Sequence, residues 1–413
     1  MRNLVQIMEK QYRNVFVLSG CQATMQTITS AMTVVTGLAG FALADNKALA
    51  TVPPTCYVLG SAITTIPASL LMKAIGRRAG FQAGTAAGMI AGAVCAAALY
   101  VADFGLLCFG MFLLGIYTAF GKYYRFAAAD AADVSFRAKA ISLTLAGGLL
   151  GGVVGPEMAK HSSSAVVGYE YLGTYLSLIA VALLAMLLLT RLDIPMLSEK
   201  ERADPGRPLA EIMRQPVFIV AAMAGMFSYG IMNLLMTSTP LAMRAHDHHF
   251  NDAAFVLQWH MIGMYAPAFF TGSLVQRFGV VRIILTGIAI NLACMLTALA
   301  GTDLINFWAA MFLLGVGWNF MYVGGSALLT ECHIPAERAK TQAANDFLIF
   351  LTMAISSASS GLLLHKSGWH AVNYGSIPFM LLALGATLWL MWQRREAGTR
   401  TVRAASGGAS SDN

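Results

Sequence analysis

Charged side chains are scarce in this chain of 413 residues. Asp, Glu, Lys and Arg together make up 11% of it, and hydrophobic residues make up 57%. Because an ordinary soluble protein has about 25% charged residues, this chain has less than half of the charge that a soluble surface needs. The composition excludes a soluble globular enzyme, a disordered chain and a nucleic-acid binder. The mean hydropathy of +0.64 is typical of a membrane protein.

Cysteine is also rare, and ligand patterns are missing. The six cysteines have no paired spacing, so the sequence predicts neither a disulfide framework nor a zinc site. The tract His246–His249 lacks the spacing of metal ligands, and no glycine pattern typical of nucleotide binding occurs. We therefore expect no cofactor and no metal. The apolar stretch after Arg13 is too long for a signal peptide, which predicts a retained first span.

Long apolar runs, in contrast, fill most of the chain. About 20 apolar residues are needed to cross the hydrocarbon layer of a bilayer, and twelve runs are long enough. The predicted spans cover residues 14–42, 50–75, 81–102, 104–128, 138–160, 168–190, 216–243, 252–276, 281–300, 305–330, 340–365 and 371–393. The sequence therefore predicts an all-α membrane protein with twelve transmembrane helices.

Lysine and arginine are distributed unevenly between the two sides of this predicted bundle. One side carries almost all of them, and the loops of the other side carry only Lys47, Lys160, Arg244 and Lys366. Positive loops stay on the cytoplasmic side of a membrane. We therefore expect a multi-pass protein of the inner (plasma) membrane with both termini in the cytoplasm.

The chain divides into two blocks of six spans. The stretch 191–215 is the longest polar loop and is predicted to be a cytoplasmic linker. It separates an N-terminal six-helix half, residues 1–190, from a C-terminal six-helix half, residues 216–393. Residues 394–413 are predicted to be a disordered cytoplasmic tail.

The two blocks resemble each other at an offset of about 200 residues. The pentapeptide at 111–115 recurs letter for letter at 311–315, and residues 136–139 are echoed by 337–340. Six spans per block place both copies in the membrane in the same orientation. Parallel repeats of this kind are typical of one architecture of secondary transporter.

Two further motifs carry a family resemblance. The loop after the second span contains Ser69, Lys73, Gly76, Arg77 and Arg78, and the second block has Gly272, Gln276 and Gly279 at the matching positions. The fifth span contains Gly147, Gly151, Gly155 and Pro156. With these motifs the chain resembles the major facilitator superfamily over residues 14–393, and the fifth span resembles that of its drug:proton antiporters.

The resemblance implies two pseudo-symmetric halves that rock about a central cavity lined by spans 1, 4, 7 and 10. It implies gating roles for Lys73, Gly76, Arg77, Arg78, Gly151, Gly155, Pro156, Gly272 and Gly279. The chain departs from the family pattern at Lys73, where the family usually has Asp. It also lacks the antiporter arginine of span 4, where Met111 precedes Gly115.

Polar side chains follow one face of the first and seventh spans. In span 1 they are Gln22, Gln26, Thr29, Thr33 and Thr36, and in span 7 they are Tyr229, Asn233 and Thr237. Steps of three and four place each set on one helical face. We expect these faces to line a cavity for substrate and water, and the alternative is hydrogen bonding that only holds the helices together.

Span 4 places Thr118, Lys122 and Arg125 on one face. Two cations there predict an anion-attracting site. The alternatives are snorkelling toward the surface or a fixed salt bridge with Asp130 or Asp133.

Further cavity candidates are His260 of span 8 and three residues of span 10. The latter are Trp318, Asn319 and Tyr322. His260 could take up a proton near neutral pH, and the alternative is a hydrogen-bonded structural role.

Acids within the spans are few, and they are the candidates for proton coupling. Asp346 of span 11 is the first candidate and Glu157 of span 5 is the second. Burial favours the protonated carboxyl and a nearby cation favours the carboxylate, so movement of either kind couples protonation to conformation. The alternative for Asp346 is a fixed gate pair with Lys73, Arg125 or Arg338.

Together these features predict a proton-coupled secondary transporter rather than an enzyme. It would move a small organic molecule, anionic or amphipathic, across the membrane by alternating access, as an exporter. The alternative within this class is a proton-driven importer of an anionic nutrient, and the alternative of another class is a non-transporting membrane sensor. We expect a monomer in the lipid bilayer whose partners are its substrate and protons.

Overall fold

The chain folds into two groups of long helices. The computed structural model describes residues 2–46, 49, 52–196 and 204–407, and within them we find helices and no strand. The first group contains α1 (Arg2–Leu43), α2 (Val52–Ile75), α3 (Arg77–Val101), α4 (Phe104–Gly121), α5 (Tyr124–Asp130), α6 (Arg137–Ser162) and α7 (Leu172–Leu189). The second group contains α10 (Pro216–Ala245), α11 (Phe250–Tyr265), α12 (Ala268–Phe278), α13 (Val280–Ala300), α14 (Leu304–Leu329) and α15 (Arg338–Gly407).

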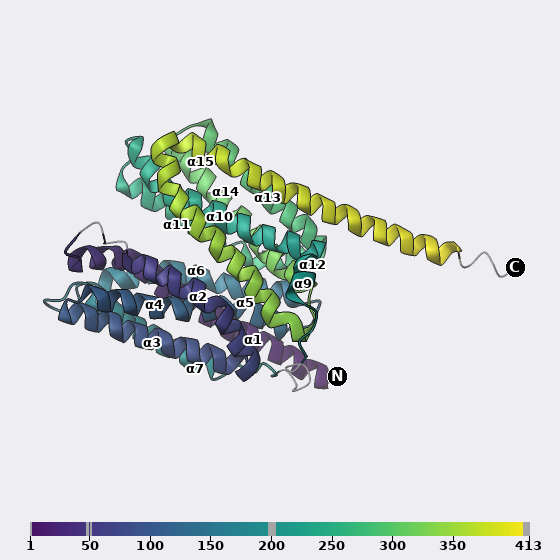
Figure 1. Ribbon diagram of the computed structural model, residues 1–413, viewed down its shortest axis with the longest axis horizontal. Coiled ribbons are helices and arrows are strands. Elements are labelled where there is room, and N and C mark those ends of the chain that lie inside the picture. The colour runs from purple at the N-terminus through teal and green to yellow at the C-terminus, as the bar shows by residue number, and fades with distance from the viewer. Residues whose placement is uncertain (1, 47–48, 50–51, 197–203, 408–413) are drawn as a thin grey trace.

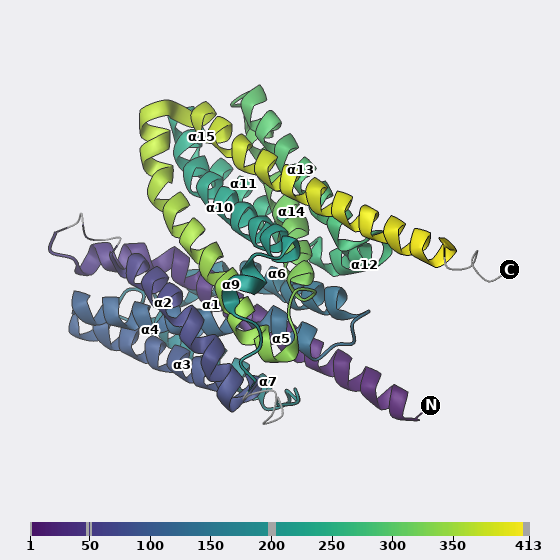
Figure 2. The same cartoon turned by 45° about the vertical axis from the view of Figure 1, so that its right-hand side comes forward.

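The two groups lie side by side as two halves of one bundle. Figure 1 shows the purple and blue helices of the first half below the teal to yellow helices of the second half. Both ends of the chain lie at the same end of the bundle, which Figure 2 also shows. We call this end the terminal end.

The fold agrees with the predicted twelve passes through the membrane, although the eighth span and the last two spans differ in detail. Ten helices of the described residues are long and apolar enough to cross a membrane without interruption. The predicted span 252–276 is broken into α11 and α12 at Pro267, which has no N–H to continue a helix. The last two predicted spans are joined in α15, which turns sharply at Gly368 with a positive φ of 75°.

The prediction of a disordered tail after residue 393 is wrong over residues 394–407. These residues continue α15 as helix to Gly407, and residues 408–413 lie outside the described residues. The physical reason is that each residue added to an existing helix costs little, because nucleation has already taken place. Seven of these fourteen residues are also Arg or Ala, which favour helix.

The internal repeat is visible in the backbone. Gly76 lies between α2 and α3 with φ 88° and ψ 159°, and Gly279 lies between α12 and α13 with φ 87° and ψ 148°. Residues with a side chain rarely adopt this conformation. The two halves therefore use glycine for the same tight connection at matching positions.

Small residues allow α6 to pack directly against α1. A Cβ atom at Gly151 would lie 2.4 Å from the carbonyl oxygen of Ala23, and one at Gly155 would lie 2.6 Å from that of Thr27. Such close backbone approach is a usual way for membrane helices to associate without charged contacts. A gating role was predicted for these glycines, and such a role would depend on the close packing of α6 against α1.

The predicted linker 191–215 is fastened to both halves where the structure describes it. Asp193 pairs with Lys10 of α1 at 2.7 Å, and the Lys73 ammonium of α2 donates to the carbonyl oxygen of Asp204 at 3.4 Å. On the second half, Arg207 pairs with Glu337 at 2.7 Å. Residues 197–203 of the linker lie outside the described residues.

The Glu337 side chain is fully buried, and the guanidinium and backbone N–H of Arg207 both donate to its carboxylate. These hydrogen bonds lower the pKa of Glu337 from its ordinary value of 4.5 to about 2. A lowered pKa means that the pair stabilises the folded protein fully above the ordinary value and loses this effect as the pH falls toward 2.

We therefore expect Glu337→Gln to lower the free energy of unfolding by about 1–3 kcal/mol at pH 7, because the charged hydrogen bonds are lost. Thermal unfolding of the detergent-purified protein measures this effect. The difference between the variant and the wild type should shrink as the pH falls below 4.5. Glu211→Gln, at an exposed acid of the same linker, is the matched control, and an equal loss there would contradict the assignment.

Candidate functional site

A cavity of about 450 Å³ lies between the two halves. Seven predicted cavity residues line it, and they come from α1, from α10 and from the end of α4. They are Gln26, Thr29, Thr33, Thr118, Lys122, Tyr229 and Asn233. Pro156, which was predicted as a gating residue, lies in the same wall. The polar face of α1 thus points into the cavity rather than toward the surrounding lipid.

Other predicted cavity residues lie elsewhere. Gln22 is 5% exposed and Thr36 is 2% exposed, and neither lines the cavity. The Thr36 hydroxyl lies 3.1 Å from that of Tyr175 on α7, so this end of the stripe joins helices within one half. Thr237 is exposed but lies outside the cavity wall.

The prediction that His260 and Asn319 line the cavity is wrong, because both side chains serve helix packing. His260 is fully buried, with its Nδ1 2.8 Å from the carbonyl oxygen of Met311 on α14. The Asn319 amide donates to the carbonyl oxygen of Met264 at 2.7 Å. That carbonyl lies beside the break between α11 and α12, where regular helix hydrogen bonds are interrupted.

Several residues of the cavity wall are not among those predicted from the sequence. Two of them are tyrosines: the Tyr57 hydroxyl donates to Thr118 at 3.1 Å, and the Tyr265 hydroxyl donates to the Gln26 side chain at 2.9 Å. The second bond joins the two halves. The wall also contains the methionines Met25, Met232, Met236, Met261, Met264 and Met353. Their number in the sequence was a signal, since flexible thioethers suit a variable binding surface.

An aromatic cluster supports the base of the cavity. Tyr229 meets Trp318 edge to face at a ring distance of 5.1 Å, and Trp318 stacks on Tyr322 at 4.9 Å. The two predicted residues of α14 are thus buried behind Tyr229 instead of lining the cavity. The Lys122 ammonium donates to the Tyr229 hydroxyl at 3.2 Å. Lys122 forms no salt bridge with any described residue, so its charge faces the cavity uncompensated.

On the side of this aromatic cluster that faces the terminal end, a buried ion pair joins the two halves. Arg125, at 2% exposure, donates to a carboxylate oxygen of Asp346 at 2.5 Å. The same guanidinium donates to the Ser326 hydroxyl at 3.1 Å and packs over the Tyr322 ring at 4.6 Å. Arg125 was predicted to line the cavity, and it does not. The alternative pairing with Asp130 or Asp133 is also wrong, because Arg125 pairs with Asp346. Among the partners predicted for Asp346, the structure selects Arg125.

At the terminal end, a second ionic cluster closes the space between the halves. Asp130 of α5 pairs with Arg77 at 2.9 Å and with Arg338 at 3.1 Å. Arg77 also donates to the Gln342 side chain at 2.6 Å, and the Ser69 hydroxyl donates to the carbonyl oxygen of Ala339 at 2.8 Å. Arg77 therefore takes part in the closure that the family motif implies.

Of the remaining predicted gating residues, some lie in the contact between the two halves and others lie at the surface. Gly272 of α12 packs so closely on α6 that a Cβ would lie 2.5 Å from the Lys139 Cα atom. Lys73 contacts the linker instead of a carboxylate, and Arg78 is exposed. Every hydrogen bond and ion pair that we find between described residues of the two halves lies at the cavity or on its terminal side. The bundle is thus closed at the terminal end.

Glu157, the second proton-coupling candidate, lies away from this machinery. Its side chain is 63% exposed, and among the described residues it pairs with His161 alone, one turn further along α6, at 3.6 Å. It does not line the cavity. Of the two predicted acids, only Asp346 is buried between the halves.

Two similar helical halves around a central cavity are typical of a membrane transporter. The sequence profile of the Major Facilitator Superfamily matches residues 15–265 and 223–411. The chain belongs to this superfamily.

The chain is 39% identical to the "Riboflavin transporter RfnT" of Brucella anthropi over 374 residues, which cover 90% of this chain and 94% of that protein. It is 29% identical to the uncharacterized transporter YdeG of Bacillus subtilis, with 91% of each chain covered.

Among solved structures, the Escherichia coli fucose transporter FucP in its outward conformation matches with a TM-score of 0.73 and 16% identity, covering 91% of this chain and 98% of that chain. The human organic anion transporter MFSD10 matches with a TM-score of 0.76 and 12% identity, covering 91% of this chain and 99% of that chain. These likenesses show the fold.

The buried Arg125–Asp346 pair predicts that removing one of its charges destabilises the protein more than removing both. Asp346→Asn leaves the Arg125 cation buried without its partner, so we expect a loss of about 3–5 kcal/mol in the free energy of unfolding. The double variant Arg125→Met with Asp346→Leu removes both charges and should recover most of this loss. Thermal unfolding in detergent compares the three proteins. A double variant no more stable than Asp346→Asn would contradict this account.

Proposed function

We propose that this transporter carries riboflavin or a closely related isoalloxazine compound. The observation that carries the proposal is the 39% identity to a riboflavin transporter over 90% of this chain. Riboflavin is amphipathic, as the sequence predicts for the substrate, but it is uncharged near neutral pH. The anionic part of that prediction is therefore not retained.

The cavity suits the two parts of such a molecule. Its volume of about 450 Å³ falls within the range of pockets that bury a drug-sized ligand. The rings of Tyr57, Tyr229 and Tyr265 and the methionine thioethers can contact the planar isoalloxazine ring. The hydroxyls of Thr29 and Thr33 lie on the same wall and can bond the polyhydroxyl side chain.

Lys122 is the residue we propose to orient the ring. Its ammonium has no carboxylate partner among the described residues and reaches the base of the cavity beside Tyr229. The carbonyl oxygens of the isoalloxazine ring are acceptors, and hydrogen bonds from a charged donor are stronger than neutral ones.

We further propose that transport is coupled to protons through Asp346. Its ion pair with Arg125 joins the two halves and lies under the cavity. Rocking of the halves separates the two side chains, and a carboxyl that loses a nearby cation binds a proton more readily. Protonation of Asp346 would then accompany the separation of the two halves. The terminal end of the bundle would face the cytoplasm.

For direction, we propose uptake rather than the export predicted from the sequence. Riboflavin is a vitamin, which favours the alternative of nutrient import. The same machinery runs either way according to its gradients, so the proposal concerns the direction of net flux in the cell. We retain the prediction of a monomer in the inner membrane.

Uptake of riboflavin into vesicles that contain the purified protein tests the substrate. Saturable uptake is expected in the wild type, and Lys122→Gln should weaken riboflavin binding by about tenfold, because a charged hydrogen bond is lost. Lys160→Gln, at an exposed lysine of α6, is the matched control and should bind as the wild type does. A wild-type protein that neither binds nor moves riboflavin would reject this substrate.

The same vesicles test the coupling residue. An imposed proton gradient should accelerate uptake by the wild type and by Glu157→Gln, but not by the double variant Arg125→Met with Asp346→Leu. The double variant is chosen because it leaves no unpaired buried charge. Uptake by this variant that still follows the proton gradient would exclude Asp346 as the coupling group.

A further inference from the structure

The repeat gives the terminal end two equivalent grooves. One lies between the end of α2 and the start of α15 and is lined by Met72, Lys73, Arg77, Arg338 and Ala339. The other lies between the end of α12 and the start of α6 and is lined by Val275, Gln276, Val280, Arg137 and Ala138. These residues correspond pairwise at an offset of about 200. We call them the first and the second groove.

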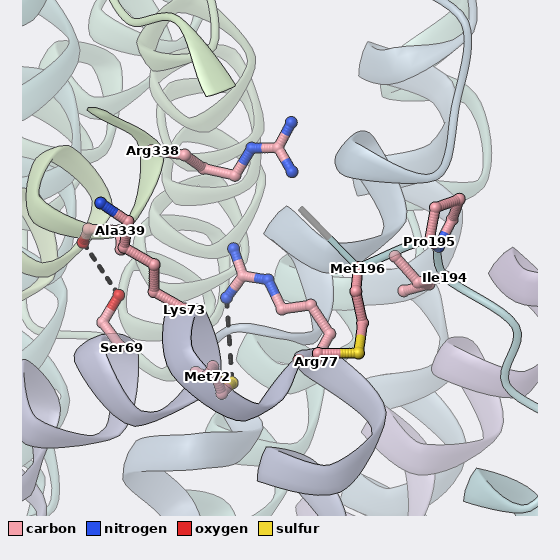
Figure 3. Close-up of a pocket in the computed structure, with 10 residues that line it drawn as sticks. Ser69, Met72, Lys73, Arg77, Ile194, Pro195, Met196, Arg338 and Ala339 are labelled. Carbon is pink, nitrogen blue, oxygen red and sulfur yellow. Dashed lines mark hydrogen bonds between the residues drawn. The ribbon is translucent and has the colours of Figure 1, made fainter. Parts of the chain in front are cut away.

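The first groove is filled by the chain itself. Ile194, Pro195 and Met196 of the linker lie across it, opposite the end of α2 and Arg77, as Figure 3 shows. Only about 30 Å³ of free space remains. Both of its arginines pair with the same carboxylate, that of Asp130.

The second groove is open, and the acid equivalent to Asp130 does not pair with its arginine. Its volume is about 800 Å³. Arg137 corresponds to Arg338, and Glu331 corresponds to Asp130, because each acid lies seven residues before one of these arginines. Arg137 forms no salt bridge with any residue that the structure describes. The one acid of the lining, Glu331, already pairs with Arg394 at 2.6 Å.

The surroundings of the second groove combine apolar and cationic surface. Val134 on its rim is 77% exposed, and Phe278 beside it is 44% exposed. The exposed Arg277 and Arg282 lie next to the lining residues in the sequence. Exposed apolar side chains beside cations at the ends of membrane helices are typical of the level where lipid headgroups lie.

We propose that the second groove binds an anionic phospholipid. The lipid phosphate takes the place that Asp130 has in the first groove: Arg137 donates to it, together with the hydroxyl of Ser135. An acyl chain lies along Val134, Val275 and Val280, as the linker segment does in the first groove. A soluble anion would leave most of the 800 Å³ unfilled.

Occupancy of this groove is expected to depend on the conformation. Its walls come from both halves, which touch here through a hydrogen bond from the Gln276 amide to the carbonyl oxygen of Ser135. The Gly272 N–H also donates to the Ser142 hydroxyl at 2.9 Å. Separation of the halves at the terminal end would take the groove apart, so the lipid binds the closed state better and increases its population.

Native mass spectrometry of the full-length protein tests the proposal. We expect dioleoyl phosphatidylglycerol to remain bound where dioleoyl phosphatidylcholine does not. Arg137→Gln should reduce retention of phosphatidylglycerol about tenfold, and Arg214→Gln, at an exposed arginine outside the groove, should leave it unchanged. Equal retention by Arg137→Gln and the wild type would overturn the proposal.

A second variant separates loss of binding from loss of folding. Thr330→Asp gives Arg137 an internal carboxylate, as Asp130 gives Arg338, and should abolish the preference for phosphatidylglycerol while the protein stays folded. Thr330→Asn, which adds no charge, should keep most of the preference. If Thr330→Asp retains the lipid, or if inorganic phosphate displaces it at millimolar concentration, the lipid assignment is wrong.

Discussion

The two halves are held together at the terminal end by charges that are buried only while that end is closed. Asp130 lies between Arg77 and Arg338, and Arg125 lies against Asp346. Attraction between such charges is strong in a low dielectric and weak in water. Separating the halves would replace protein partners by water around each charge. A change of state therefore requires that water, protons or substrate compensate for these pairs.

The cavity lies next to the Arg125–Asp346 pair, and a series of side-chain contacts connects the two. Lys122 donates to Tyr229, and Tyr229 packs on Tyr322, which in turn packs on the Arg125 guanidinium. A ligand that displaced the Lys122 ammonium would thus act within two side chains of the Arg125–Asp346 pair. Packed interiors respond to such shifts by changing between discrete arrangements rather than by gradual deformation.

The two halves have similar backbones, but the charged side chains at their terminal ends have different partners. Gly76 and Gly279 adopt the same conformation, and Asp130 of the first half corresponds in sequence to Glu331 of the second. Asp130 pairs with Arg77 and Arg338 beside the first groove, which the linker covers. Glu331 pairs instead with Arg394, so Arg137 has no salt bridge with a described residue, and the second groove is uncovered. The first and the second groove, at the same end of the bundle, can therefore bind different partners.

The sequence alone determined the helical class, the twelve passes and the repeat, because hydropathy and periodicity are local properties of each segment. It also put Gln26, Thr29 and Asn233 on helical faces, and these faces line the cavity of the structure, since helical spacing decides which residues share a face. Tertiary structure decided the rest. His260 packs against α14 instead of the cavity, and Arg125 pairs with a residue 221 positions away. Which helix lies opposite a polar side chain depends on contacts between distant segments, and no local pattern records them.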